Sequence, residues 1–113
     1  MSNKAVIEGL EENIKRSREF VDLGKALERL ERNKDFLTVV KHAYFEKEAV
    51  RLVHLKADPS MQTAERQQSI IDQIDAIGAL AAYFRTLAFN ADQAQRNIAS
   101  DEQTVEELRN EDN

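Results

Sequence analysis

The sequence predicts an all-α protein, built on a long antiparallel helical hairpin of residues 35–57 and 63–98 with an additional N-terminal helix and bundle or coiled-coil-like packing. Apolar residues recur at helical spacing through most of the 113 residues. Three glycines and one proline are too few for the tight turns of a β-sandwich or barrel. Apolar residues make up 42% and charged residues 33%, a balance typical of amphipathic helices.

The first expected helix covers about residues 3–32. Its apolar residues keep a spacing of three to four at Ile7, Leu10, Ile14 and Val21. The apolar pattern then changes phase near Ser17, and Gly24 weakens a helix by about 1 kcal/mol relative to Ala. We therefore expect a bend or a break between these two residues. Asn33 is expected to end this segment and Asp35 to cap the next one.

The second expected helix, residues 35–57, has an apolar arc that is wider than one partner helix can cover. One stripe contains Val39, Ala43, Val50, Val53 and Ala57, and a neighbouring stripe contains Phe45, Ala49 and Leu52. So wide an arc is typical of a helix that is central in a bundle or lies at a subunit contact. Asp58 and Pro59 predict the end of this helix, because proline lacks an N–H and restricts the residue before it.

The third expected helix starts after Thr63, a suitable N-cap. A heptad seam runs along it through Ile70, Ile74, Ile77, Ala81, Phe84, Ala88 and Ala91, and is widened by Leu80, Leu87 and Ala94. The small residues of this seam would let a partner helix approach closely. At 1.5 Å per residue the helix 63–98 would be about 54 Å long, so we expect an overhang or an oligomer.

The domain organisation expected from these patterns is one helical domain, residues 1–100, followed by an acidic C-terminal tail, residues 101–113. Residues 1–57 carry 12 basic and 10 acidic side chains, whereas residues 58–113 carry 4 basic and 11 acidic ones. The tail holds six acids and few apolar residues, which bury too little surface to offset the entropy of ordering. We expect it to be partly helical or mobile.

A search for catalytic, cofactor and metal-binding motifs assigns no residue to any of these roles. The lack of cysteine excludes disulfides, thiolate zinc sites and cysteine nucleophiles. Glycines at 9, 24 and 78 exclude a Gly-rich phosphate loop. His42 and Glu46 could supply two metal ligands, but a metal site usually needs three or four. Asp72 and Asp75 are expected on a solvated helix face. The prediction is therefore a protein that is not an enzyme and needs no cofactor.

Nucleic acid and membrane are both disfavoured as partners. The formal charge is -5, whereas proteins that coat nucleic acid usually carry a basic excess. The basic cluster Lys15, Arg16 and Arg18 lies among glutamates that nearly neutralise it. No apolar run approaches the roughly 20 residues of a membrane span, and the N-terminal residues do not have the pattern of a signal peptide.

Residues 26–110 carry a series of short motifs in a particular order. They are Leu27-Glu28-Arg29-Leu30, Asn33-Lys34-Asp35-Phe36, Tyr44-Phe45, Glu48-Ala49, Arg51-Leu52-Val53, Ala57-Asp58-Pro59, Met61-Gln62, Tyr83-Phe84-Arg85-Thr86 and Glu106-Glu107-Leu108-Arg109. Together they resemble a group of short helical proteins encoded by tailed bacteriophages. The resemblance implies a role in the virion or its assembly and brings no established chemistry with it. Residues 1–25 lie outside it.

The function expected from these observations is that of a non-enzymatic bacteriophage protein acting by protein–protein contacts, as a structural or assembly component of the particle. Two alternatives stay open: a small acidic inhibitor of a host protein and a DNA-packaging accessory protein. The expected location is the host cytoplasm during infection, and the virion if the protein is structural.

A candidate interaction surface follows from the two wide apolar arcs. A lone hairpin would leave part of both arcs exposed, and large exposed apolar patches usually mark partner sites. We expect a homo-oligomer or docking on other phage proteins. The residues expected to make the contact are Phe45, Leu52, Leu55, Leu80, Phe84 and Leu87.

Overall fold

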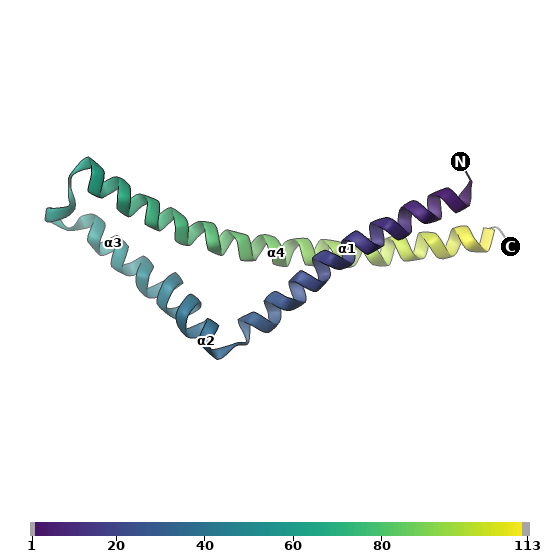
Figure 1. Cartoon of the computed structure of the whole chain (residues 1–113), viewed down its shortest axis with the longest axis horizontal. Helices are drawn as coiled ribbons and strands as arrows, with labels where there is room; N and C mark the ends of the chain where they lie inside the picture. Colours follow the sequence, from purple (N-terminus) through teal and green to yellow (C-terminus); the bar gives the residue numbers. More distant parts are fainter. Residues whose placement is uncertain (1, 112–113) are drawn as a thin grey trace. The chain divides into compact units, whose positions relative to one another are not determined.

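The computed structural model describes residues 2–111, which are helical almost throughout and contain no strand (Figure 1). The elements are α1 (Asn3–Glu31), α2 (Lys34–Phe36), the π-helix η1 (Leu37–Glu48), α3 (Ala49–Ala57), the short 3-10 helix η2 (Pro59–Met61) and α4 (Ala64–Glu111). This confirms the predicted all-α class and the helical hairpin.

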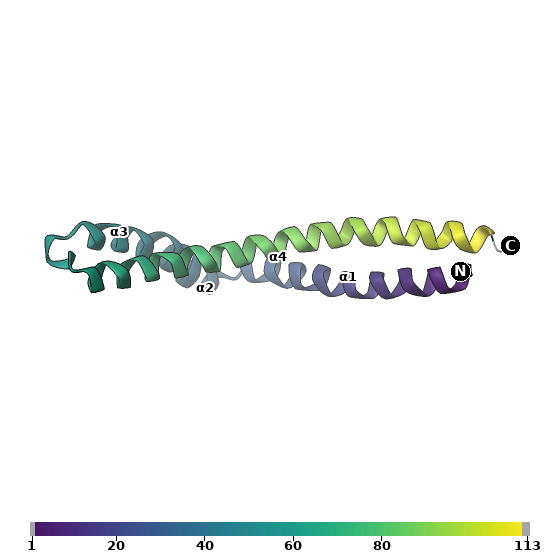
Figure 2. The same cartoon turned by 90° about the horizontal axis from the view of Figure 1, so that it is seen from above.

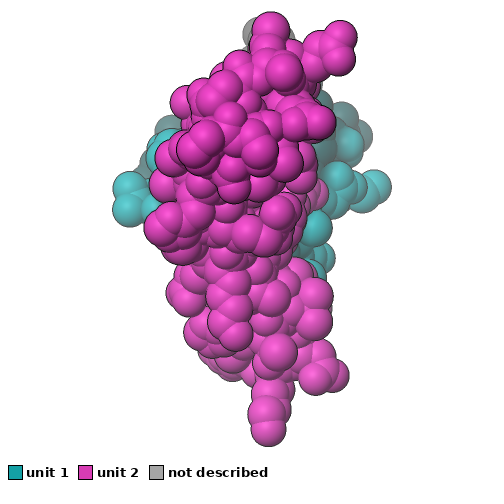
Figure 3. All heavy atoms as spheres, turned by 90° about the vertical axis from the view of Figure 1, so that its left-hand side faces the viewer, with its two compact units in different colours: residues 1–27, 86–113 teal, residues 28–85 magenta. Residues whose placement is uncertain are grey.

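The chain divides into two compact units, coloured separately in Figure 3. Unit 1 comprises residues 1–27 and 86–113, and unit 2 comprises residues 28–85. This differs from the expected single domain of residues 1–100, because each half of α4 packs against a different part of the chain. Residues 101–111, which were expected to form a separate tail, belong to unit 1.

Unit 2 is the predicted hairpin. Its first arm is the helical run from α2 to α3, and its second arm is the first half of α4 (Figure 1). The core consists of Leu52, Ile70 and Ile77, of which Leu52 is fully buried. Partly buried side chains pack around it, namely Tyr44, Phe45, Ala49, Leu55, Met61 and Ile74. Burying Leu52 alone contributes about 1.5–3 kcal/mol relative to leaving it in water.

The first arm has a wider helical turn than the sequence pattern predicts. Within η1 and its flanks the less exposed residues recur as neighbouring pairs four residues apart, at 36–37, 40–41, 44–45 and 48–49. A repeat of four exceeds the 3.6 residues per turn of an α-helix, so a π-helix keeps these pairs on one side. The ring of Phe84 on α4 meets Phe36 and Phe45 at centroid separations of 5.7 and 6.1 Å.

The turn between the two arms is held by polar side chains. The Asp58 carboxylate accepts hydrogen bonds from the Ser60 backbone N–H at 2.8 Å and from its hydroxyl at 2.7 Å. The side-chain amides of Gln62 and Gln67 both donate to the Lys56 carbonyl, which the end of α3 leaves without a helical partner. The helix break predicted at Pro59 is thus confirmed.

Two predicted helix caps have different outcomes. Thr63 caps α4 as expected, its hydroxyl accepting from the Arg66 N–H at 3.3 Å. The cap of the second segment is Asn33 and not Asp35, because the Asn33 side chain accepts from the Phe36 N–H at 3.0 Å. Asn33 therefore lies just after the end of α1, as predicted, and also caps the start of α2.

Unit 1 is an antiparallel pair formed by α1 and the second half of α4, which lie side by side in Figure 2. Arg18 forms an ion pair with Glu102 at 3.3 Å, and Arg109 forms one with Glu11. The buried residues are Ile14, Gly24, Leu27, Ala94 and Val105.

The break expected between Ser17 and Gly24 is wrong, because α1 is one continuous helix through Glu31. The less exposed residues of α1 step by alternating three and four at Ile7, Leu10, Ile14, Ser17, Val21 and Gly24. The apparent phase change arose because two of these seam positions hold the small residues Ser17 and Gly24. Small residues at a seam allow two helices to approach closely.

Residues 101–111 are helical and form the end of α4. The acidic composition had suggested a tail that is partly helical or mobile. Val105 is buried and Leu108 is half-buried, so the apolar seam of α4 continues through this acidic segment. The acids Glu102, Glu106 and Glu107 are exposed to solvent.

The apolar seam of α4 differs from the predicted seam at one residue. Ala88 was expected to lie on it but is exposed.

Gly24→Ala should destabilise unit 1, although Gly to Ala normally stabilises a helix by about 0.5–1 kcal/mol. A Cβ on Gly24 would overlap the Cβ of Ala91, and overpacking of this kind costs about 1–3 kcal/mol. Urea unfolding followed by circular dichroism measures the change. Gly9→Ala is the control, because nothing lies within 4 Å of a Cβ there, and it should be neutral or stabilising. Equal effects at both glycines would contradict the close approach, whereas Ala91→Gly should restore part of the loss.

Ser60→Ala should raise the pKa of Asp58 part of the way to its ordinary value. The hydrogen bond from the Ser60 hydroxyl is the main cause that lowers this pKa, followed by the bond from the Ser60 backbone N–H, which remains. A lowered pKa in the folded state adds stability above the unfolded pKa, near 3.8, that is lost as the pH falls through the folded value. The variant should therefore lose less stability on acidification below about pH 4. Carboxyl NMR titration measures the pKa, and Ser69→Ala is the control that should leave it unchanged.

Candidate functional site

Of the six residues expected to form the interaction surface, one is buried and five are half-buried. Leu52 lies at the centre of the unit 2 core, and Phe45 and Leu55 are half-buried against that core. Phe84 is half-buried between the rings of Phe36 and Phe45. Leu80 and Leu87 are also half-buried on α4. Within unit 2, Leu52, Phe45 and Leu55 thus help to cover the hairpin's own core, and Leu52 is fully buried there.

The exposed apolar side chains lie elsewhere. Those of large residues are Phe20, Leu23, Leu30, Val39, Val50, Val53, Tyr83 and Phe89. Three of the eight are valines on the first arm of unit 2, with exposed fractions of 63% for Val39, 56% for Val50 and 61% for Val53. Ala43 and Ala57 are exposed on the same arm. We call these five residues, Val39, Ala43, Val50, Val53 and Ala57, the valine face.

The valine face is the first of the two apolar stripes that the sequence shows in this segment. The second stripe, Phe45, Ala49 and Leu52, faces the core. The signal that separates the two stripes is side-chain size, since the stripe with the larger side chains buries more apolar area. Sequence reasoning identified both stripes and named residues of the second one, Phe45 and Leu52, as contact residues, whereas the first one is the more exposed.

Charged residues border the valine face. Lys47 and Lys56 are exposed, and neither takes part in an ion pair among the residues that the structure describes. Glu46 lies between Ala43 and Val50 in the sequence, and its carboxylate is 3.4 Å from Nδ1 of His42. This arm therefore presents an exposed apolar row with basic side chains beside it.

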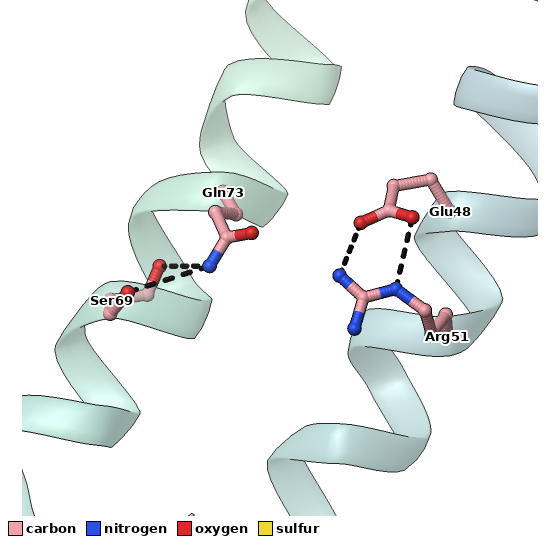
Figure 4. Close-up of polar contacts among 4 residues, drawn as sticks. All are labelled: Glu48, Arg51, Ser69 and Gln73. Atoms are coloured by element: carbon pink, nitrogen blue, oxygen red, sulfur yellow. Dashed lines mark hydrogen bonds and ion pairs between the residues drawn. The ribbon is translucent and has the colours of Figure 1, made fainter.

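A bidentate pair on the same arm neutralises two further charges. Arg51 donates from Nε and Nη2 to the two carboxylate oxygens of Glu48, with the Nε bond at 3.0 Å (Figure 4). The hydrogen bond from Arg51, aided by its positive charge, lowers the pKa of Glu48 against a smaller opposing effect of burial. The same bond raises the pKa of Arg51. Across the hairpin, the Gln73 side chain donates to Ser69 one turn earlier in α4 (Figure 4).

Unit 1 has a surface depression lined by both of its helices, and four of its five charged side chains form two ion pairs across the two helices. Its floor is apolar, formed by Ile14 and Val105. Its rim carries Arg18 with Glu102 and Arg109 with Glu11. Because each of these arginines already binds a carboxylate, the rim holds the two helices together.

The remaining candidates for chemistry lie apart on exposed helix faces. Within residues 2–111, no three His, Cys, Asp or Glu side chains are grouped so that they could hold a metal ion. His42 and Glu46 form only the pair expected from the sequence. The Asp72 carboxylate accepts from the Gln68 amide at 2.8 Å, and Asp75 is exposed. None of the described helices combines the length and the apolar character needed to cross a membrane.

Phe84→Ala should lower the free energy of unfolding by about 3 kcal/mol, the lower end of the usual cost for a buried Phe, because the ring is half-buried between two others. Phe89→Ala is the matched control on the same helix, since its ring is 63% exposed, and it should change stability by about 0.5 kcal/mol at most. Thermal or urea unfolding measures both. An unchanged midpoint for Phe84→Ala would show that this ring does not belong to the core.

Comparisons of this chain with protein-family models, with curated proteins and with solved structures return no match. The interpretation of the site therefore depends on the geometry of the chain itself, in which the valine face carries three exposed valines of unit 2.

Proposed function

We propose that this chain is a non-enzymatic component of a tailed-phage particle or of its assembly, and that it acts by contacts with other phage proteins. The observation that supports the contact role is the exposed valine face, where three valines are each more than half exposed. The resemblance of residues 26–110 to short helical phage proteins supports the proposal that the chain belongs to a tailed phage.

The energetics favour a contact at such a surface. Each CH₂ group that a partner removes from water contributes about 0.8 kcal/mol. The valine face can be covered without disturbing the core of its own unit, because Leu52, Ile70 and Ile77 lie among the residues packed between the two arms. The hairpin thus acts as a stable support for a surface that remains available.

The two alternatives find less support in the geometry. An inhibitor that mimics nucleic acid would present its acids to a partner, whereas two acids of unit 1, Glu11 and Glu102, are paired with arginines of the same chain. A DNA-packaging protein would need a basic surface on α1, but Arg18 is paired with Glu102 and several glutamates lie among the other basic residues of this helix. Both arrangements use charge to organise the protein's own surface.

Mass spectrometry of purified particles and of assembly intermediates should find the chain at a fixed ratio to the major structural proteins. Sedimentation of the purified protein, alone and mixed with those proteins, then shows whether it self-associates or docks on one of them. Absence from every particle fraction combined with co-purification with a host enzyme would contradict the proposal and favour the inhibitor. DNA binding that weakens steeply with salt would favour the packaging role.

A further inference from the structure

We infer that the valine face binds an amphipathic helix of another polypeptide whose apolar seam is flanked by acidic residues. This inference rests on the proposed contact function, because it names the partner chemistry of that contact.

The apolar part of the face fits a helix as its occupant. In α3 its positions 50, 53 and 57 follow one another at steps of three and four, the spacing with which helices pack along one another. Val39 and Ala43 precede them in η1, four residues apart, which matches the four-residue repeat of that π-helix. The residues are Val and Ala, which are short and let two helix backbones come close. The face lies outside the pairing of the two arms, since all its members are exposed while the opposite stripe packs on α4.

The charge around the face specifies the flanks of the partner. Residues 34–57 carry five basic and three acidic side chains, for +2, whereas the whole chain carries -5 and the remainder therefore -7. Two of the five basic side chains are already paired, because Arg51 binds Glu48 on the same arm and Lys41 binds Glu31 outside it. The remaining charges of residues 34–57 are Lys34, Lys47 and Lys56 against Asp35 and Glu46. Lys47 lies three residues before Val50, and Lys56 lies three residues after Val53, so both are neighbours of the face on the helix surface. Acidic flanks on the partner would neutralise these lysines.

The same charges argue against a second copy of the chain as the occupant. Two valine faces packed on each other would bring Lys47 and Lys56 of both copies into one interface. Like charges brought together at an interface oppose association. The partner is therefore a different surface with the opposite charge.

The composition of the face argues against a lipid surface. Helices that lie in a membrane interface carry large Trp, Phe or Leu residues on the apolar side. Here the row consists of small Val and Ala residues and is interrupted by the Glu46 carboxylate. Close contact with another helix suits small side chains, and a polar residue of that helix can pair with Glu46.

The test uses the full chain and two synthetic helical peptides with the same Leu and Ala seam, one with Glu and the other with Lys at all flanking positions. Fluorescence anisotropy should show that the Glu peptide binds about tenfold or more tightly than the Lys peptide. Its affinity should fall as salt rises, because the flanking charges are at the surface. Equal binding of both peptides, or preference for the Lys peptide, would overturn the inference.

Variants locate the binding on the face. The double variant Val50→Gln and Val53→Gln should abolish binding of the Glu peptide and keep the helical circular dichroism, since both side chains are exposed. Phe89→Gln, equally exposed but in unit 1, should bind normally. The double variant Lys47→Glu and Lys56→Glu should lose the preference for the Glu peptide. Loss of binding in Phe89→Gln but not in the valine variant would overturn the assignment of the surface.

Two further measurements cover the other occupants. Sedimentation should detect no self-association that the valine double variant removes, and anionic vesicles should not bind through the same face. Self-association that the valine double variant removes would show that the occupant is a second copy. Vesicle binding through the valine face would show that it is a lipid surface, and either result would overturn the inference. These outcomes are separate from the proposed function, because a chain absent from particles can still select the Glu peptide, and a particle component can fail to do so.

Discussion

The apolar seam of α4 is the constraint on which the rest of the structure depends. Residues seven apart, Ile70, Ile77, Phe84, Ala91, Ile98 and Val105, are buried or half-buried along the whole helix. Each of these residues has a second seam residue close behind it. In unit 2 this residue lies four positions later, as Ile74 does after Ile70, whereas in unit 1 it lies three positions later, as Ala94 does after Ala91. Ala88 lies four positions after Phe84, where the spacing has already changed to three, and it is exposed. Each half of α4 thus pairs with its own partner segment, α1 in unit 1 and residues 34–57 in unit 2.

The size of the side chains along this seam decides how each partner packs. In unit 2 the partner must accommodate the ring of Phe84, and two further rings from the π-helical arm surround it. In unit 1 the seam holds Ala91, and the matching residue on α1 is Gly24, where even one methyl group would collide. A large residue at position 84 in unit 2 and a small one at position 91 in unit 1 therefore require different partner residues.

Many polar side chains bind groups of the same chain and so stabilise its own structure. Asp58, Asn33 and Thr63 bind backbone N–H groups that begin helical segments. Arg18 and Arg109 join the two helices of unit 1 through carboxylates. What remains unused on the first arm of unit 2 is an apolar row with Lys47 and Lys56 beside it. The function that we propose makes use of this remainder.

The sequence by itself determined the helical class, the turn at Pro59, the cap at Thr63 and the two apolar stripes of residues 35–57, because spacing, proline geometry and capping act over a few residues. Only the tertiary structure decided which stripe is buried, since that depends on the α4 residues opposite. It also decided that Gly24 is a point of close packing and that residues 101–111 are ordered on α1, where the local pattern indicated a break and a tail. Burial joins residues far apart in the chain, such as Gly24 with Ala91, and no local pattern contains that pairing.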